Sequence, residues 1–289
     1  TVLVLGATGT VGPHVVAALT AQATPVRVLT RDGGRARAIL PTHVDVRSGD
    51  LWNDDDVLGA VADDVTAVFL LTSHAYDMAE AQLRVLRALR RLPVRIVKLS
   101  GTSSAIRPDG PHACRQHWEI EQVLVAGGQP FVVLRANAFM QTLIDQIMLP
   151  AALEAGVVAN PIADAGISFI DARDVGACAA TVLTDPQFDG QTLALTGPAA
   201  VTYQQIADHI AATTGRSVSV RQITPADVRA NLAARGMPAW ETEHFEEMYQ
   251  LFRNGASEFV TDDVARILGR PATTVEDYLT RHPRLAATA

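Results

Sequence analysis

The sequence is poor in lysine and cysteine, and these shortages exclude several kinds of protein. Lys98 is the only lysine, and acidic residues outnumber basic ones by 31 to 24, which gives a formal net charge of −7. That balance argues against a protein that binds nucleic acid directly. Two cysteines, Cys114 and Cys178, are too few for a disulfide framework and lack metal-ligand spacing. We therefore expect reduced thiols and no metal site.

Long apolar stretches are also lacking. No apolar run approaches the roughly 18 residues that a membrane helix needs, so we expect no contact with a membrane. Nothing typical of a signal peptide precedes the first apolar run, which begins at Val2. The sequence therefore predicts a cytoplasmic protein.

The first half of the chain alternates short apolar runs with helical patterns. The runs predict strands over residues 2–5, 25–29, 43–47, 66–71, 94–99 and 130–135. The helical patterns lie between them, over residues 11–21, 34–40, 54–61, 76–91 and about 114–126. Continuously apolar strands separated by helices are typical of a parallel sheet covered on both faces. We predict a doubly wound Rossmann fold of the α/β class.

The second half is less regular and predicts a smaller C-terminal α/β domain. Strand candidates cover residues 157–161, 167–170, 192–195 and 217–222. Helix candidates cover residues 174–183, 202–214 with Thr202 as the cap, 226–234, 241–252 and 262–268. We expect residues 1–150 to form a dinucleotide-binding domain to which residues 171–198 return. Residues 151–170 and 199–289 would then form a substrate-binding domain.

A glycine-rich segment between the first strand and the first helix is the clearest motif. It has the spacing Gly6-x-x-Gly9-x-x-Gly12, which lets the backbone turn tightly and approach a pyrophosphate. Amide groups at the start of the following helix would then meet the phosphates. The residues expected at the cofactor are Gly6, Thr8, Gly9, Thr10, Val11 and Gly12.

The end of the second strand bears on the choice between NADP(H) and NAD(H). Arg31 follows this strand, and a guanidinium there suits the 2′-phosphate of NADP(H), with Arg35 and Arg37 close behind. Asp32 would instead bind the ribose of NAD(H) if the strand ended one residue later. We predict NADP(H), with NAD(H) the weaker alternative.

Three further strand ends point to the same crevice, because ligands bind outside the carboxyl ends of parallel strands. The cofactor candidates there are Asp50, Leu51, Leu71, Thr72, Ser73 and Ser100. Small or hydroxylated side chains at these places permit close approach of ribose and nicotinamide.

Several segments resemble one family, the NmrA-like branch of atypical short-chain dehydrogenases. They are the strand followed by GATGTVG, Arg31, Gly49-Asp50-Leu51, His117-Trp118-Glu119-Ile120-Glu121, FVVLRANAF at residues 131–139, SFIDARDV at residues 168–175, and Leu195-Thr196-Gly197-Pro198 followed by Thr202-Tyr203. Within this family the chain is most similar to type 2 NAD(P)H quinone oxidoreductases and to triphenylmethane and azo-dye reductases. The resemblance implies a Rossmann fold, NADP(H) and a pocket between two domains. The family also contains redox-sensing regulators.

The chain lacks the Tyr-x-x-x-Lys pair of typical short-chain dehydrogenases. Alignment with the family places His117 and Glu121 at these two positions, and residues four apart share one face of a helix. His117 is our candidate catalytic residue, a proton donor whose ring Glu121 would orient. The alternative interpretation is that the pair only packs the domain interface.

Substrate contacts are expected from two segments. His112 and Cys114 precede the helix of His117 in a loop, and no feature marks Cys114 as a nucleophile. After the sixth strand, Asn137 would bond the nicotinamide amide or the substrate, while Phe139 would stack on a flat ring. The substrate candidates are therefore His112, Phe139 and Met140, although plain core packing explains the last two equally well.

Two other groups of residues are explained by structural roles, the second of them only as an alternative. We expect Asp171, Arg173 and Asp174 to cap a helix and to form ion pairs between the domains. The segment of residues 240–259 has apolar residues at helical spacing. That helix would form one wall of the substrate pocket, or simply pack the small domain or a subunit contact.

These features together predict an NADPH-dependent oxidoreductase acting on a flat conjugated or carbonyl small molecule, such as a quinone, in an interdomain cleft. The alternatives are an NADP(H)-binding sensor that signals through a protein partner and a biosynthetic tailoring enzyme. A homodimer is the expected assembly if the chain associates at all.

Overall fold

The computed structural model describes residues 1–61 and 64–286, and its centre is a sheet of seven parallel strands. The strands are β1 (Val2–Leu5), β2 (Val26–Thr30), β3 (Asp45–Ser48), β4 (Ala67–Leu70), β5 (Arg95–Ser100), β6 (Phe131–Ala136) and β9 (Gln191–Leu195). Their order is β3-β2-β1-β4-β5-β6-β9, and every pair is parallel. This is the doubly wound Rossmann arrangement, so the predicted fold class is confirmed, and the expected return of residues 192–195 to the sheet is β9.

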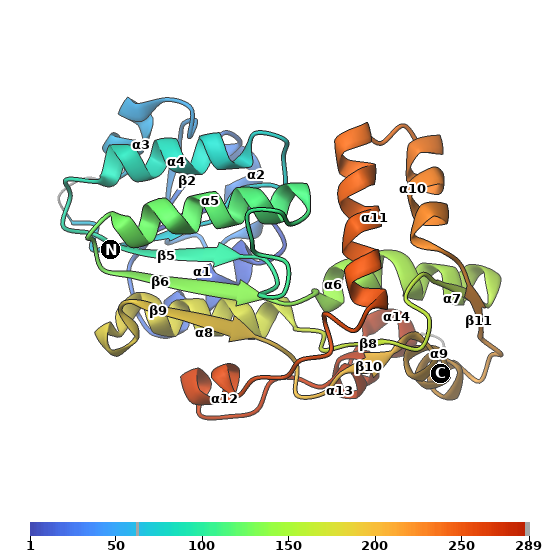
Figure 1. The fold of residues 1–289 in the computed structure, drawn as a ribbon. Coiled ribbons are helices and arrows are strands. Elements are labelled where there is room, and N and C mark those ends of the chain that lie inside the picture. The colour runs from blue at the N-terminus through green and yellow to red at the C-terminus, as the bar shows by residue number, and fades with distance from the viewer. Residues whose placement is uncertain (62–63, 287–289) are drawn as a thin grey trace.

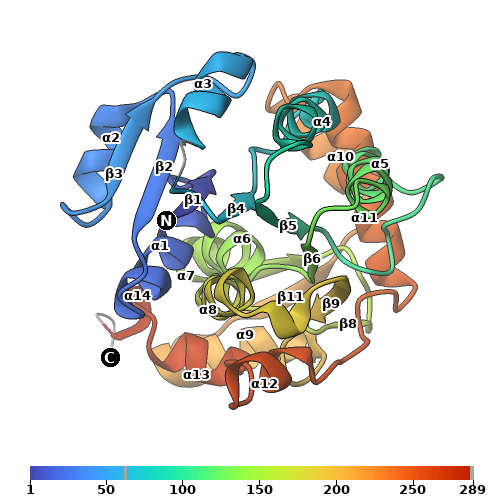
Figure 2. The ribbon, with the colours of Figure 1, turned by 90° about the vertical axis from the view of Figure 1, so that its left-hand side faces the viewer.

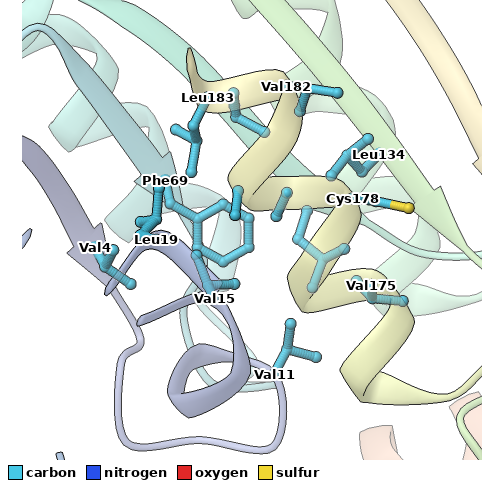
Figure 3. Close-up of a cluster of buried hydrophobic side chains, with 14 of the residues drawn as sticks. Val4, Val11, Val15, Leu19, Phe69, Leu134, Val175, Cys178, Val182 and Leu183 are labelled. Atoms are coloured by element: carbon cyan, nitrogen blue, oxygen red, sulfur yellow. The ribbon is translucent and has the colours of Figure 1, made fainter. Parts of the chain in front are cut away.

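Helices cover both faces of this sheet, as Figure 2 shows in a view along the strands. One layer contains α1 (Gly12–Ala21) and α8 (Ala172–Thr184), and the other contains α3 (Asp54–Ala60), α4 (Met78–Leu89) and α5 (His112–Ala126). Alternate strand residues supply the two cores, so Val4 joins the first layer and Leu5 the second. Phe69 of β4, which is 0% exposed, lies among Val15 and Leu19 of α1 and residues of α8 (Figure 3). Burying such a ring contributes roughly 1.5–3 kcal/mol.

The second half of the chain has its own apolar core beside the carboxyl ends of the main strands (Figure 1). Two small sheets belong to it: β7 (Val157–Asn160) runs parallel to β11 (Ser219–Gln222), and β8 (Gly166–Ile167) runs antiparallel to β10 (Val201–Thr202). Its helices are α6 (Met140–Leu143), α7 (Leu149–Ala155), α9 (Tyr203–Thr214), α10 (Pro225–Ala234), α11 (Ala239–Arg253), α13 (Val275–Thr280) and α14 (Pro283–Ala286). Among residues 1–61 and 64–286, no helix is both long and apolar enough to span a bilayer.

Several local predictions need correction, mostly around α6. The helical segment from Met140 to Ala155, which includes a π-helical turn, was not predicted. The strand expected over residues 167–170 is shorter, because only Gly166–Ile167 pairs as a strand. His112 and Cys114 lie in the first turn of α5 instead of the preceding loop. Thr202 does cap α9, with a reciprocal bond to Gln205.

The carboxylates of the FIDARDV segment have the structural roles expected of them. Asp171 is 0% exposed, caps α8 by accepting from the Arg173 amide at 2.9 Å, and forms an ion pair with the Arg173 guanidinium. Asp174 accepts from Arg270 at 2.7 Å and from the backbone amide of Thr273 at 2.6 Å. These bonds fasten α8 to the C-terminal segment.

Asn137, by contrast, does not have the role predicted for it. It is 2% exposed, and its amide nitrogen donates to the Ser168 hydroxyl at 2.7 Å and to the backbone oxygens of Ser168 and Ser257 at 3.1 Å. Its amide oxygen accepts from the Ser257 hydroxyl at 2.6 Å. The expected bond to nicotinamide or substrate is therefore wrong, because the whole amide already joins the end of β6 to two distant segments.

Replacing this amide is predicted to cost stability and to leave cofactor binding unchanged. Asn137→Ala leaves buried hydrogen-bonding groups without partners, so the free energy of unfolding should fall by about 2–3 kcal/mol. Ser257→Ala removes one of the same bonds and should cost about 1 kcal/mol. Urea denaturation followed by circular dichroism measures both. Unchanged stability with weaker NADPH binding would instead return Asn137 to the cofactor site.

Candidate functional site

The glycine loop lies between β1 and α1, and two of its glycines are required by packing. Gly6 has a φ of +71°, and a Cβ there would lie 2.8 Å from the backbone oxygen of Leu71. A Cβ on Gly12 would lie 2.2 Å from the backbone oxygen of Gly6. Gly9 is different, because it is exposed and its Cβ would meet only one protein atom, at 3.5 Å. Gly6 and Gly12 are thus packed tightly against backbone atoms, whereas open space lies next to Gly9.

The start of α1 behind this loop suits an anion. Its first turn contains no acidic residue, so its free amides and their partial positive charge are not neutralised by the protein itself. Such a helix start, next to a backbone that a ligand can approach closely, fits the diphosphate of a dinucleotide. Gly9, Thr10, Val11 and Gly12 all lie at this turn, as predicted.

A groove of about 360 Å³ runs from the loop across the carboxyl ends of β2, β3 and β4. Predicted cofactor residues make up half of its lining: Gly6, Thr8, Arg31, Asp50, Leu51, Leu71, Thr72 and Ser73. Trp52 and Met78 also line it and were not predicted. Four strand ends and their loops therefore line one groove.

The residues after β2 favour a phosphate over a bare ribose. Arg31 is exposed and lines the groove. Asp32 caps α2 (Gly33–Ile39), where its carboxylate accepts from the Arg35 amide at 2.9 Å. The Arg35 guanidinium reaches back to the Thr8 carbonyl at 3.4 Å. Asp32, the alternative ribose ligand, is thus bonded within the protein, whereas the guanidinium groups of Arg31 and Arg35 lie near the loop.

Glu121 and Ser100 form a buried polar contact between α5 and the sheet. The Glu121 carboxylate, 4% exposed, pairs with Arg135 of β6 at 2.5 Å and accepts from the Ser100 hydroxyl at 2.6 Å. Two predictions are therefore wrong in detail. Glu121 does not orient the ring of His117, and the Ser100 hydroxyl is already bonded inside the protein instead of facing the cofactor.

The partner of His117 is instead the only lysine of the chain. Lys98 of β5 is 0% exposed, and its Nζ lies 3.0 Å from Nδ1 of His117. Burial lowers the pKa of Lys98 to about 7, although the negative charge of Glu121 opposes this shift. Burial also holds the pKa of His117 well below its usual value, with further lowering by the charges of Lys98, His74 and His244. His117 is consequently neutral at physiological pH.

An aromatic cluster stands next to this pair. We use this name for His74 and Tyr76 of the β4–α4 loop, His112 of α5, and Trp240, His244 and Phe245 of α11. His74 stacks on Trp240 with 5.2 Å between ring centroids, and Tyr76 stacks on His112 at 4.8 Å. These contacts pack α11 against the β4–α4 loop and α5, and a role for α11 as a wall of the substrate pocket stays a prediction. His74 and Tyr76 were missed, and their only signal was aromatic character just after a strand end.

The other substrate candidates have different outcomes. Met140 is 0% exposed inside the apolar core of the second half, so the prediction that it contacts substrate is wrong. Phe139 is only partly buried, and its role stays a prediction. Cys114 is buried against Met248, and burial raises the pKa of its thiol to about 12, which makes it a poor nucleophile. Within residues 1–61 and 64–286, no group of three or more His, Cys, Asp or Glu side chains is arranged so that it could hold a metal ion.

Comparisons with known proteins agree with this geometry. The azoreductase of Xenophilus azovorans, named as using NAD(P)H, is 30% identical over 282 residues, or 97% of each chain. A (4-alkanoyl-5-oxo-2,5-dihydrofuran-3-yl)methyl phosphate reductase of Streptomyces griseus is 32% identical over 283 residues, again 97% of each chain. The solved structure of an Escherichia coli NADPH-dependent quinone oxidoreductase in complex with NADPH superposes with a TM-score of 0.87 at 23% identity, over 97% of this chain and 99% of that one.

The family profile extends over almost the whole chain. It matches residues 1–279, which include the glycine loop, α5 with His117, and the aromatic cluster. The resemblance inferred from the sequence motifs is therefore confirmed. The chain belongs to the NmrA-like family.

Proposed function

We propose that the protein is an oxidoreductase that uses NAD(P)H to reduce a flat, conjugated or carbonyl-containing small molecule of the quinone type. The glycine loop carries this proposal, because Gly6 and Gly12 admit no side chain and Gly9 leaves space before α1. A dinucleotide diphosphate requires such a close approach of backbone amides. The printed names of the azoreductase and the quinone oxidoreductase support the same class.

NADP(H) would lie along the groove and the glycine loop beside it. Residues 9–12 would hold the diphosphate at the start of α1, Arg31 and Arg35 the 2′-phosphate, and residues 71–73 the ribose next to the nicotinamide. When bound, the reduced nicotinamide supplies a hydride. The chain itself has to position the acceptor, exclude water and provide a proton.

The aromatic cluster and His117 would receive the acceptor. Ring faces of His74, Tyr76 and Trp240 suit a flat conjugated molecule, because offset stacking favours such partners. Two relatives at 30% identity or more have names that describe an azoreductase and a reductase of a 5-oxo-2,5-dihydrofuranyl methyl phosphate. The domain limits, a homodimer and a cytoplasmic location stay predictions from the sequence.

The proposed function is tested by NADPH oxidation against a panel of quinones, azo dyes and enones, with NADH in parallel. We expect turnover with at least one of these acceptors, and faster turnover with NADPH than with NADH. Tight NADPH binding without oxidation by any acceptor would contradict the proposal and favour a sensor that acts through a protein partner.

Arg31 is predicted to set the preference for NADPH. Arg31→Ala removes a charge-assisted contact to the 2′-phosphate, so the Kd for NADPH should rise about 10- to 100-fold while the Kd for NADH changes little. Arg90→Ala, which removes an exposed arginine beyond the far end of α4, is the matched control. Fluorescence titration measures both constants for the unmodified protein and for each variant. An equal loss of both cofactors would place Arg31 outside the 2′-phosphate site.

Substitution of Gly9 is predicted to weaken cofactor binding alone, whereas substitution of Gly12 is predicted to lower the stability of the fold. Gly9→Ala places a methyl group in the space left for the diphosphate without a clash in the protein, so the Tm should hold while NADPH binding weakens at least tenfold. Gly12→Ala instead forces a methyl group to 2.2 Å from a backbone oxygen, so its Tm should fall. Thermal unfolding with and without NADPH distinguishes them. Full NADPH affinity in the Gly9→Ala variant would contradict the assignment of the loop.

A further inference from the structure

Lys98 occupies a position that the fold would normally give to an apolar side chain. In β5, Ile96, Lys98 and Ser100 alternate on the face that α5 covers, and Ile96 belongs to the apolar core there. Lys98 is 0% exposed. A buried ammonium group costs free energy unless strong partners offset its lost hydration. The groups that contact Lys98 therefore determine how readily its ammonium releases a proton.

The partners of Lys98 leave its charge only weakly compensated. Its Nζ donates to the Leu99 backbone oxygen at 2.7 Å and lies 3.0 Å from Nδ1 of His117. The nearest carboxylate belongs to Glu121, but Arg135 and Ser100 already bond it. Because Arg135 largely neutralises Glu121, burial dominates and the pKa of Lys98 falls to about 7. The ammonium is thus able to release a proton near neutral pH.

The ring of His117 connects this lysine with the end of β5. A Cβ built on Gly101 would lie 3.4 Å from Cδ2 and 3.9 Å from Nε2 of His117, so the Nε2 edge faces the loop after β5. Nδ1 faces the sheet and Lys98. An ammonium donates to Nδ1 only if that nitrogen carries no hydrogen, which leaves the N–H on Nε2. The imidazole therefore presents a donor on the side where strand ends meet their ligands.

We propose that Lys98 is the source of the proton for reduction of the acceptor and that it acts through His117. The inference rests on the proposed function. The hydride adds with its electron pair to one atom of the acceptor, and the π pair of the broken bond moves to the neighbouring atom. That atom takes the proton from Nε2, while Nδ1 takes one from Lys98, which becomes a neutral amine. Solvent restores the missing proton through the partly exposed ring of His117.

His117 alone would be a poor acid. A neutral imidazole that gives up its single N–H becomes an anion, unless its other nitrogen gains a proton at the same moment. Burial, together with the positive charge of Lys98, keeps the imidazolium form from supplying that proton instead. Coupled to Lys98, the pair acts as one acid with an apparent pKa near that of the lysine. This pairing replaces the missing Tyr-x-x-x-Lys pair by a different route.

Activity against pH is the first test, with the fastest acceptor of the panel and saturating NADPH. For the unmodified protein, kcat should decline as the pH rises through about 7, because Lys98 then loses its proton. Lys98→Met should lower kcat about 100-fold and abolish this decline, with little change in the Kd for NADPH. Ile96→Met, on the same face of β5, should keep both the rate and the pH profile. An unchanged profile in Lys98→Met would overturn the proposal.

The Lys98→Arg variant tests whether Lys98 supplies a proton or only donates a hydrogen bond to His117. A guanidinium donates a hydrogen bond but does not release its proton in this pH range. This variant should therefore keep the histidine tautomer yet lose kcat nearly as strongly as Lys98→Met. Recovery of kcat in Lys98→Arg would overturn the proton-source role.

The tautomer of His117 is determined without any cofactor or acceptor. Long-range ¹H–¹⁵N spectra of histidine-labelled protein, assigned with His117→Asn, should show hydrogen on Nε2 and none on Nδ1 below pH 7. In Lys98→Met the Nδ1–H tautomer should appear, and the pKa of His117 should rise because a nearby positive charge is removed. Identical tautomers in both proteins would overturn the proposal. Failure of the panel would instead contradict only the proposed function, since these spectra need no turnover.

Discussion

Close backbone packing around α1 is the constraint on which the rest of the structure depends. A Cβ on Gly12 would strike the Gly6 backbone, and a Cβ on Gly176 of α8 would lie 2.6 Å from the Cβ of His14. Only glycines at these places let α1 start directly behind the loop and pack against α8. The amino end of α1 is thereby held at the carboxyl edge of the sheet. The groove across β1 to β4 exists because that helix start and four strand ends share one edge.

A second constraint, the ion pair between Glu121 and Arg135, determines the chemistry beside the groove. It joins α5 to β6 in a largely buried setting, where the partners remain together because neither charge is well solvated alone. The charge of Glu121 still favours the protonated form of Lys98, but burial outweighs it and lowers the proton affinity of that lysine. A contact that fixes a helix on a sheet thus also sets an ionisable group near neutral pH. The pKa of Lys98 and the orientation of His117 both follow from how α5 is held.

Features that depend on local sequence were predictable, and features that depend on distant contacts were not. The strands, the glycine loop and the lining of the groove follow from residues within one βα unit, so the sequence patterns located them. Asn137 and Met140 were misjudged because their partners, Ser257 and the core of the second half, are remote in sequence. Glu121 was paired with His117 by helical spacing alone, whereas the sheet below offers Arg135. The Lys98–His117 contact had one signal, a lone lysine inside an apolar strand.

The second half of the chain contributes α11 to the aromatic cluster, where Trp240 and His244 contact His74. Burial lowers the pKa of His244 to about 3 and lowers that of His74 as well, although the negative charge of Glu241 opposes the shift of His74. These imidazoles therefore stay uncharged near neutral pH and lie beside Trp240 as flat rings. Clustered histidines keep one another neutral, because each added proton would repel the next. Under the proposed function, such a cluster favours an uncharged planar acceptor and leaves Lys98 as the group that carries the transferable proton. The hydride would then reach the acceptor from the groove, and the proton would reach it from His117 of α5. The sheet holds the groove and α5 together at one edge.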